Sequence, residues 1–322
     1  MARWLVTGGA GFIGSHVVEA LIERGNFVRV VDDLSTGSIT NLPADARIEF
    51  IEADLAEPGV AEAAVAGVDY AVHLAAIPSV PRSVREPRRS HRANVEATHE
   101  LLLAARDAGV GRVLVASSSS VYGESETLPK HEGMAPAPIS PYALQKLVGE
   151  RYAALYTKLH GLETVALRFF NVFGPRQSPA SQYSGVISLF TAALLAGRAP
   201  VIYGDGEQTR DFTFVTDVAR GVLLAGEAPA AAVSGRVLNL ARGGRTSVNA
   251  IYATLERATG TRTPARHADP RPGDVRHSHA DVTLARELLG FEARVTVEEG
   301  LRRTVAWHRA RCADRRSAGR AP

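Results

Sequence analysis

Short runs of apolar, β-prone residues alternate with longer amphipathic patterns through the first half of the 322-residue chain. The first helical pattern carries Ile13, Val17, Leu21 and Ile22 on one face and ends at Gly25, a residue suited to a left-handed cap. Such alternation predicts βαβ units, whose parallel sheet is covered by helices on both faces. We therefore expect a doubly wound α/β sheet of six strands, at residues 4–7, 27–31, 48–51, 70–74, 113–116 and 164–168.

The pattern loosens after residue 170, where prolines and glycines interrupt short elements, and a clear strand returns only at 237–240. Because the length exceeds that of one usual domain, we expect a large domain at 1–170 and a smaller α/β domain at 171–322. The stretch 211–240 could return to the large sheet, which would interleave the two domains.

Composition removes several classes of protein from consideration. No stretch approaches the roughly 18 uninterrupted apolar residues of a membrane span, and the first residues lack the pattern of a signal peptide. We therefore expect a cytoplasmic protein with no membrane partner. The net charge is only +3, and the basic clusters at 82–92 and 302–320 have no interleaved aromatic residues, so no nucleic-acid partner is expected. No convincing metal-ligand constellation is present either.

The strongest chemical motif is a glycine-rich turn that follows the first strand and opens the first helix. Gly8 permits the tight turn, Gly11 lets the backbone approach a pyrophosphate, and Gly14 allows close packing of the helix. The N-terminus of that helix would face the phosphate charge. This context predicts a dinucleotide bound in the manner of a Rossmann fold.

Acidic residues near the second and third strands refine this prediction. Asp32 ends the second strand, where a carboxylate can accept both ribose hydroxyls. A 2′-phosphate beside Asp32 and Asp33 would meet two like charges with no adjacent arginine, so we predict NAD rather than NADP. Asp54 suits the adenine amino group, and an exposed turn aspartate is an equally good interpretation. His73, at an apolar strand end, is interpreted as a core histidine.

A second constellation involves hydroxyl and amino groups. Ser140 and Pro141 predict a helix start that places Tyr142 and Lys146 on one face. For Tyr142 to act as a base at neutral pH, its pKa must fall by roughly 3 units, and a cation at i+4 acts in that direction, as would a bound nicotinamide ring. Such a pair alone is common on helix surfaces. Here a serine run at 117–120 also lies at the carboxyl edge of the sheet, where such folds bind ligands.

With these motifs the sequence resembles the extended short-chain dehydrogenase/reductase family, in particular the UDP-hexose 4-epimerases. The matching segments cover nearly the whole chain, at residues 7–14, 73–76, 94, 117–123, 142–146, 167–174, 203–212 and 271–278. The resemblance implies that Ser118 hydrogen-bonds the reacting oxygen, that Tyr142 is the acid/base in contact with substrate, and that Lys146 holds the nicotinamide ribose. It also implies cofactor contacts from Phe12, Ile13, Leu34, Ser35, Thr36, Gly37, Leu55, Leu74, Ala75, Ala76, Asn94 and Phe170.

The same resemblance assigns a UDP-sugar to the second half of the chain. Asn171 would meet a phosphate or sugar oxygen and Tyr203 would stack on the uracil. Arg210 and Arg271 would clamp the diphosphate, for which bidentate arginine is well suited, although ordinary surface ion pairs are the alternative. The remaining residues that the resemblance places around the substrate are Gln177, Val186, Asp274 and Ser278.

Ser278 is the position most informative about the sugar. In the family a tyrosine there restricts the pocket to plain hexoses, whereas a small residue leaves room for a C2 acetamido group. The segments 271–278 and 79–83 resemble UDP-N-acetylglucosamine 4-epimerases, so we hypothesise that acetamido sugars are accepted. Ser119 and Ser120 stand where related dehydratases and decarboxylases carry acidic residues, which favours simple epimerisation.

Two other functions remain open at this point. Arg82 or another cation could bind a C6 carboxylate, which would make the protein a UDP-glucuronate 4-epimerase or a related nucleotide-sugar enzyme. A catalytically silent NAD-binding protein is the alternative from another class, and the intact Ser118, Tyr142 and Lys146 argue against it. The resemblance further implies a homodimer, in which helices expected at 92–108 and 141–160 pair with their copies in a four-helix bundle.

Overall fold

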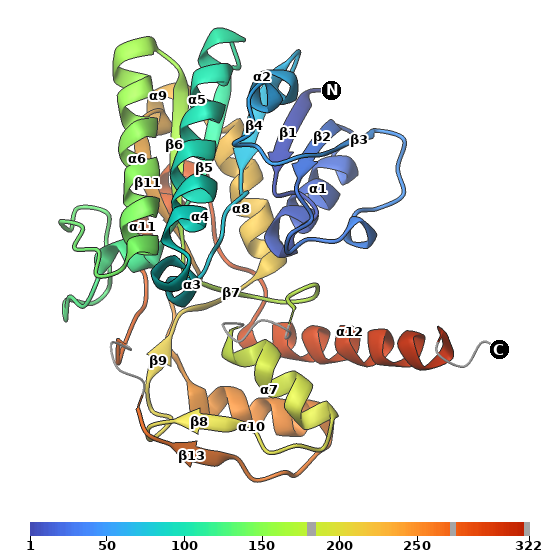
Figure 1. The fold of residues 1–322 in the computed structure, drawn as a ribbon. Helices are drawn as coiled ribbons and strands as arrows, with labels where there is room; N and C mark the ends of the chain where they lie inside the picture. Colours follow the sequence, from blue (N-terminus) through green and yellow to red (C-terminus); the bar gives the residue numbers. More distant parts are fainter. Residues whose placement is uncertain (179–184, 271–274, 319–322) are drawn as a thin grey trace.

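The computed structural model describes residues 1–178, 185–270 and 275–318. Its main sheet contains seven parallel strands in the order β11-β6-β5-β4-β1-β2-β3 (Figure 1). The strands are β1 (Arg3–Thr7), β2 (Phe27–Asp32), β3 (Ile48–Glu52), β4 (Tyr70–His73), β5 (Arg112–Ser118), β6 (Glu163–Phe169) and β11 (Arg236–Leu240). The predicted doubly wound parallel sheet is thus confirmed, with β11 pairing in parallel with β6 as a seventh strand. The strand order reverses between β1 and β4, and ligands bind such sheets at this point, outside the carboxyl ends.

Helices cover both faces of the sheet. One face carries α1 (Phe12–Glu23), α8 (Val215–Glu227), α9 (Ala230–Val233) and α11 (Thr283–Leu289), and the other carries α2 (Val60–Val65), α5 (Ala97–Asp107) and α6 (Pro141–His160). Along β1, Trp4 and Val6 enter the core on the first face, whereas Leu5 enters the core on the second. This follows because successive strand side chains point to opposite faces. Hydrophobic alternation therefore fixes which residues of β1 face each helical layer.

Buried arginines hold helix ends against the sheet. Arg112, at the start of β5, donates from Nη1 to three carbonyl oxygens at the end of α8 at 2.7–3.0 Å. Its Nε and Nη2 donate to Glu163 at the start of β6. Arg29 of β2 donates in the same way to three carbonyls at the end of α2. Because the last carbonyls of a helix lack partners within it, these cations satisfy them and favour the negative end of the helix dipole.

A smaller layer lies below the carboxyl edge of the main sheet in Figure 1. Its helices α7 (Val186–Leu195), α10 (Val248–Thr259) and α12 (Val297–Ala318) share a core around Phe173, Phe214 and Leu255. Its strands form three pairs: β7 (Asn171–Phe173) with β10 (Phe212–Phe214), β8 (Val201–Tyr203) with β13 (Arg266–Ala268), and β9 (Thr209–Arg210) with β12 (Thr246–Ser247). Among the helices that the structure describes, none has both the length and the apolar character needed to cross a membrane.

The helix expected at 92–108 is confirmed, and it contains a π turn. The chain forms α3 (Val80–Arg85), α4 (Pro87–His91), the π-helical turn η2 (Arg92–Glu96) and α5, and residues 87–107 are helical without a break. Glu86 leaves the helical conformation at φ −124° and ψ 57°, because a proline disfavours the helical region in the residue before it. The π turn places Asn94 in the interior, and such turns often occur at functional sites. The expected helix therefore forms, but it begins at Pro87 and carries a π turn that the sequence did not predict.

The helix expected at 141–160 is confirmed as α6. Ser140 is its N-cap, with Oγ accepting from the Ala143 amide at 3.2 Å, and Pro141 occupies the first turn. Gly161 ends the helix at φ +72°, in the left-handed region. Two short 3-10 turns complete the upper layer, η1 (Ile39–Asn41) and η3 (Ser119–Tyr122). The start of α6 predicted from Ser140 and Pro141 and its expected end at 160 are both confirmed.

Candidate active site

The glycine turn after β1 is packed so tightly that side chains are excluded. Gly8 has φ +67°, and a Cβ there would lie 2.7 Å from the backbone nitrogen of Ala75. A Cβ on Gly14 would lie 2.1 Å from the carbonyl oxygen of Gly8. Gly11 is the N-cap of α1 and offers no side-chain cap, so the first amides of α1 have no side-chain acceptor at that position. This arrangement fits a dinucleotide pyrophosphate at the helix N-terminus, as predicted.

The loop after β4 forms the neighbouring wall. The Leu74 amide donates to the Thr7 carbonyl, and the Ala75 amide donates to Thr7 Oγ1. Asn94 Oδ1 accepts from the Ile77 amide at 2.7 Å, and its Nδ2 donates to Ile77 O at 3.2 Å. Asn94 is 2% exposed, so its side chain supports this loop from the protein side. Its direct contact with the cofactor stays a prediction, as do those of Leu74, Ala75 and Ala76.

The end of β2 carries the predicted ribose ligand. Asp32 accepts from the Ala10 amide through Oδ2 and from the Leu34 amide through Oδ1, both at 2.9 Å. Burial raises the pKa of Asp32, and these amide hydrogen bonds oppose the change. A Cβ on Gly37 would lie 3.0 Å from Asp32 Oδ1, so the loop folds back over the carboxylate. Residues 33–37 contain no arginine, so this loop offers no cation to a 2′-phosphate.

The other predicted members of this loop are arranged around Asp33. Its Oδ1 accepts from both the amide and the hydroxyl of Ser35, while Leu34 adopts a left-handed φ of +54°. Thr36 is exposed, and Phe12 and Ile13 lie half-buried at the start of α1. Phe170 is buried beside Tyr122, with ring centroids 6.3 Å apart. These positions are compatible with cofactor contacts, which stay predictions.

The structure also places Asp54, Leu55 and His73, for which sequence analysis made separate predictions. Asp54 accepts from the Ala56 amide at 2.9 Å and lies 3.4 Å from Arg92 Nη2, so it caps its own turn and leaves both earlier interpretations open. Leu55 is 3% exposed and packs in the core, which leaves its backbone as the part that could meet a cofactor. His73 is a core histidine bonded to the hydroxyls of two threonines, and burial lowers its pKa to about 3.

The three predicted catalytic groups converge at the carboxyl end of β5. Ser118 is the last residue of β5 and the N-cap of η3, where its Oγ accepts from the Ser120 amide at 3.2 Å. The side chains of Tyr142, on α6, and Ser118 lie close together. Lys146, one turn further along α6, donates from Nζ to the Ala116 carbonyl at 3.0 Å. The constellation inferred from sequence order is therefore also a spatial cluster.

The pKa of Tyr142 does not change in the direction expected from a lysine one helical turn away. Burial raises the pKa of Tyr142 above its ordinary value, and the hydrogen bond with Ser118 opposes that rise. Burial also lowers the pKa of Lys146 to about 8, because a side chain only 8% exposed loses hydration of its charged form. The groups of the protein alone thus do not lower the tyrosine pKa. The positive nicotinamide ring of bound NAD would supply the remaining favourable charge.

The residues expected around the substrate come from the lower layer. Arg210 on β9 donates from Nη1 to Arg276 O at 3.2 Å, and Ser278 donates its amide to Thr209 O at 3.1 Å. The Arg210 strand and the Ser278 segment therefore lie side by side. Tyr203 ends β8 and is 37% exposed.

The other predicted substrate residues are placed less completely. Asn171 opens β7 and is exposed, and Val186 is the first residue of α7. Gln177 donates from Nε2 to Val172 O at 3.3 Å. Arg271 and Asp274 lie outside the described residues. The structure thus gives the surroundings of Arg210 and Ser278 but leaves the proposed second half of the diphosphate clamp a prediction.

Two supporting residues escaped sequence analysis. Asp211 is fully buried and accepts from the amides of Arg242, Gly243 and Ala280 at 2.9–3.2 Å, and burial raises its pKa to about 6. It thereby fixes the Arg210 strand against the Ser278 segment. Ser83 of α3 accepts from the Tyr142 amide at 3.0 Å. Neither had a local signal, because an acidic residue beside an arginine and a serine in a polar helix are common.

Metal chemistry was not expected from the sequence. Across residues 1–178, 185–270 and 275–318, no group of three or more His, Cys, Asp or Glu side chains is arranged to hold a metal ion.

Comparison with known proteins identifies the family. Residues 4–241 match the model of the NAD dependent epimerase/dehydratase family. The UDP-glucose 4-epimerase of Mycolicibacterium smegmatis is 40% identical over 95% of this chain and 98% of its own. Two solved structures are also 40% identical, each over 96% of this chain and 99% of theirs. They are a UDP-N-acetylglucosamine 4-epimerase from Methanobrevibacter ruminantium in complex with UDP-N-acetylmuramic acid (TM-score 0.92) and a UDP-glucose 4-epimerase from Thermotoga maritima with UDP-glucose (TM-score 0.91). The chain therefore belongs to the NAD dependent epimerase/dehydratase family and is an NAD-dependent enzyme.

Proposed function

We propose that the protein inverts the C4 hydroxyl of a UDP-hexose through a transient 4-keto sugar. The observation that carries this proposal is the meeting of Ser118, Tyr142 and Lys146 at the end of β5, at the same edge of the sheet as the dinucleotide turn after β1. The similarity to UDP-sugar 4-epimerases over nearly the whole chain supports it. Ser119 and Ser120 in η3 supply hydroxyls rather than the carboxyl groups of an eliminating enzyme, which favours epimerisation over dehydration.

In the proposed cycle, Tyr142 removes the proton from the C4 hydroxyl while Ser118 hydrogen-bonds the same oxygen. NAD, which the glycine turn and Asp32 would hold, would supply a reversible hydride acceptor for C4. Lys146 holds its charge beneath the tyrosine, and Arg210 with Arg271 anchors the diphosphate while the sugar turns to present its other face. Tyr142 then returns the proton to the inverted oxygen. Since NAD is regenerated, the net reaction needs no added oxidant.

We also propose that acetamido sugars are accepted. Ser278 is small and half-buried beside β9, where a tyrosine would fill space next to Arg210. The alternative substrate, a UDP-glucuronate, needs a cation for its carboxylate, and Arg82 is the candidate. Arg82 Nη2 lies 3.4 Å from Glu86 Oε2, so part of its charge is already compensated, which weakens this alternative.

The Ser278→Tyr variant tests substrate choice. It is expected to lower kcat/KM for UDP-GlcNAc by about 10- to 200-fold, because the added ring occupies the acetamido space, while UDP-glucose turnover is preserved. A panel of UDP-hexoses with product identification by NMR measures both. Ser278→Ala, which leaves the pocket open, serves as the control. Wild-type activity confined to the non-acetylated pair would contradict acceptance of acetamido sugars, and activity on UDP-glucuronate alone would favour the alternative.

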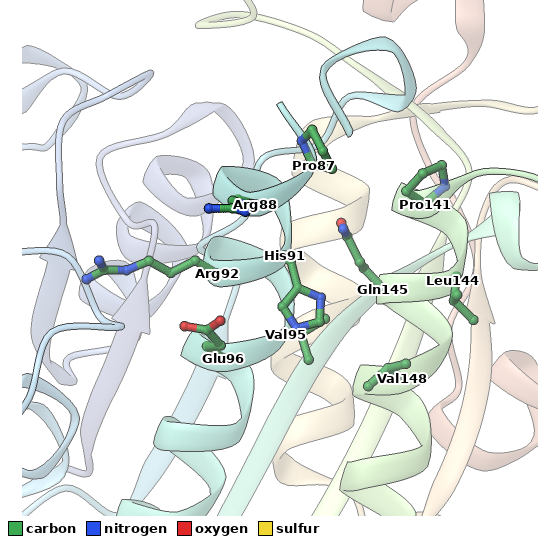
Figure 2. A pocket seen from close by; sticks show the side chains of 10 residues that line it. All are labelled: Pro87, Arg88, His91, Arg92, Val95, Glu96, Pro141, Leu144, Gln145 and Val148. Atoms are coloured by element: carbon green, nitrogen blue, oxygen red, sulfur yellow. The ribbon is translucent and has the colours of Figure 1, made fainter. Parts of the chain in front are cut away.

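We further propose that a second copy of the chain binds the outer face of α6. The exposed side chains Leu144, Leu155 and Leu159 form an apolar stripe along this helix and are 52%, 48% and 66% exposed. A groove of about 650 Å³ continues the stripe between the α4–η2 run and α6 (Figure 2). Its lining residues are Pro87, Arg88, His91, Arg92, Val95, Glu96, Pro141, Leu144, Gln145 and Val148.

The oligomeric state tests this interface. The wild type is expected to elute as a dimer in size-exclusion chromatography with light scattering, and Leu155→Glu is expected to be monomeric because a charge cannot be buried unpaired in the helix pairing. Arg257→Glu on α10 is the control, since Arg257 is exposed on a distant helix. A monomeric wild type, or a dimeric Leu155→Glu, would remove this interface.

A further inference from the structure

A buried ion pair lies directly behind the catalytic residues. Arg168 of β6 donates from Nε and Nη2 to the two carboxylate oxygens of Glu150, each at 2.7 Å. The two side chains are only 3% and 2% exposed. Ser117 Oγ donates to the same carboxylate. This Glu150–Arg168 pair therefore joins β5, β6 and α6 at one point.

Each member of this group lies one step from the active site. Glu150 follows Lys146 by one turn on α6, and Ser117 precedes Ser118 on β5. Ser117 Oγ donates to the Glu150 carboxylate, and Tyr142, two turns earlier on the same helix, lies close to Ser118. A movement of Ser117 relative to α6 must therefore also move Ser118 relative to Tyr142.

Stability alone gives a poor account of the pair. Burying two charges costs hydration free energy that is about as large as their mutual attraction. Apolar residues of similar size therefore often give a fold equal or greater stability. The arginine is constrained further, because its Cζ lies 4.6 Å from the centroid of the Tyr122 ring in η3. Tyr122 in turn donates to Asn239 Oδ1 at 2.6 Å. A planar, bidentate arginine thus fixes the strand end from two sides, which a lysine could not reproduce.

We propose that Glu150 and Arg168 are positioning residues that hold Ser118 close to Tyr142 by clamping the end of β5 to α6. The pair touches neither substrate nor cofactor in this role. It acts through Ser117 and the backbone that Ser117 shares with Ser118. The inference rests on the proposed epimerisation, because it assigns the pair to the geometry of that acid/base group.

The test compares two ion pairs that lie at opposite ends of β5 and β6. The double variant Glu150→Leu/Arg168→Met removes the positioning pair without leaving an unpaired charge. The matched control, Arg112→Met/Glu163→Leu, removes the pair at the opposite ends of β5 and β6. Arg168→Lys keeps the charge but loses bidentate geometry, so it serves where the double variant does not fold. All are measured as NAD-bound protein for kcat, KM, the pH profile of kcat and thermal stability.

The positioning pair is expected to affect kcat selectively. Its removal should lower kcat by about 10- to 100-fold and leave KM within twofold of wild type. The reason is that displacing a catalytic group by about 1 Å can lower the reaction rate about a hundredfold. The acid limb of the kcat profile should move to higher pH, because loss of the Ser118 hydrogen bond raises the pKa of Tyr142. Arg168→Lys should show the same changes at smaller size. The control pair should lower thermal stability and leave kcat and its pH profile unchanged.

Several outcomes would overturn the inference. Wild-type kcat and pH profile in the double variant or in Arg168→Lys would show that the pair has no positioning role, and equal losses of kcat in the control would show a general structural effect. A crystal structure of the double variant in which Ser118 still lies against Tyr142 would also show that the pair has no positioning role. A wild type inactive on every UDP-hexose is a separate result, which would remove the proposed function itself.

Discussion

Replacing Tyr142 by phenylalanine is expected to lower kcat by about 10²- to 10⁴-fold while the protein retains NAD. The change deletes only the hydroxyl, which lies close to Ser118, and keeps the ring at the start of α6. Proton transfer to and from the C4 oxygen would then have no positioned group. Turnover of UDP-hexoses and the amount of NAD that copurifies with the protein measure the two effects separately.

Tyr152→Phe is the matched control, because Tyr152 lies on the same helix and packs against His99, away from β5. This variant should keep wild-type kcat. A Tyr142→Phe protein with full activity would remove Tyr142 from the mechanism. Loss of bound NAD in the same variant would instead show that the hydroxyl mainly supports cofactor binding.

Replacing Lys146 by methionine is expected to abolish turnover and, at the same time, to stabilise the protein free of ligands. Burial lowers the pKa of Lys146 from 10.5 to about 8, a change that corresponds to roughly 3 kcal/mol against folding while the group is charged. Loss of the hydrogen bond to Ala116 offsets about 1 kcal/mol of this gain. Methionine keeps most of the apolar stem. We therefore expect the free energy of unfolding of Lys146→Met at pH 7 to be roughly 1–3 kcal/mol larger than that of the wild type.

The stability gained by Lys146→Met should become smaller as the pH rises. Below about pH 8 the folded wild type carries the buried ammonium and its full cost. Between pH 8 and 10.5 the folded state releases the proton while the unfolded chain keeps it, so the unfolded chain binds more protons and wild-type stability rises with pH. The advantage of Lys146→Met should therefore shrink across this window.

Urea unfolding at pH 7 and at pH 9.5 measures this dependence. Lys158→Met on the same helix is the control, because its exposed side chain should change stability by less than about 0.5 kcal/mol at either pH. A Lys146→Met protein that is destabilised equally at both pH values would show that the buried charge is not the source of the cost.

The expectation for the tyrosine itself illustrates a limit of sequence reasoning. A lysine four residues after a tyrosine on a helix suggests that its charge lowers the tyrosine pKa. In the structure Lys146 donates to Ala116, and burial raises the pKa of Tyr142 instead. The spacing therefore placed both groups correctly, but their charge balance depended on how deeply the fold buries them.

The supporting residues show the same limit. Glu150, Arg168, Ser83 and Asp211 determine how the site is held. Three of them lie in segments that match the family, yet nothing in those segments indicates which partner each side chain meets. Glu150 meets Arg168 across 18 positions of the chain, and Ser83 meets Tyr142 across 59. Contacts over such separations leave no periodic trace, because each partner fits its own local pattern equally well without the other.

Local signals by themselves determined the strands of the main sheet, the glycine turn, the ends of α6 and the order of Asp32, Ser118, Tyr142 and Lys146 along the chain. These features depend on short-range sterics, caps and hydrophobic alternation, which a single sequence records directly. Tertiary structure decided the rest: the pairing of β11 with β6, the π turn at Asn94, and the buried Glu150–Arg168 pair. Those depend on which distant surfaces meet and how much water they exclude, and that is settled only when the whole chain packs.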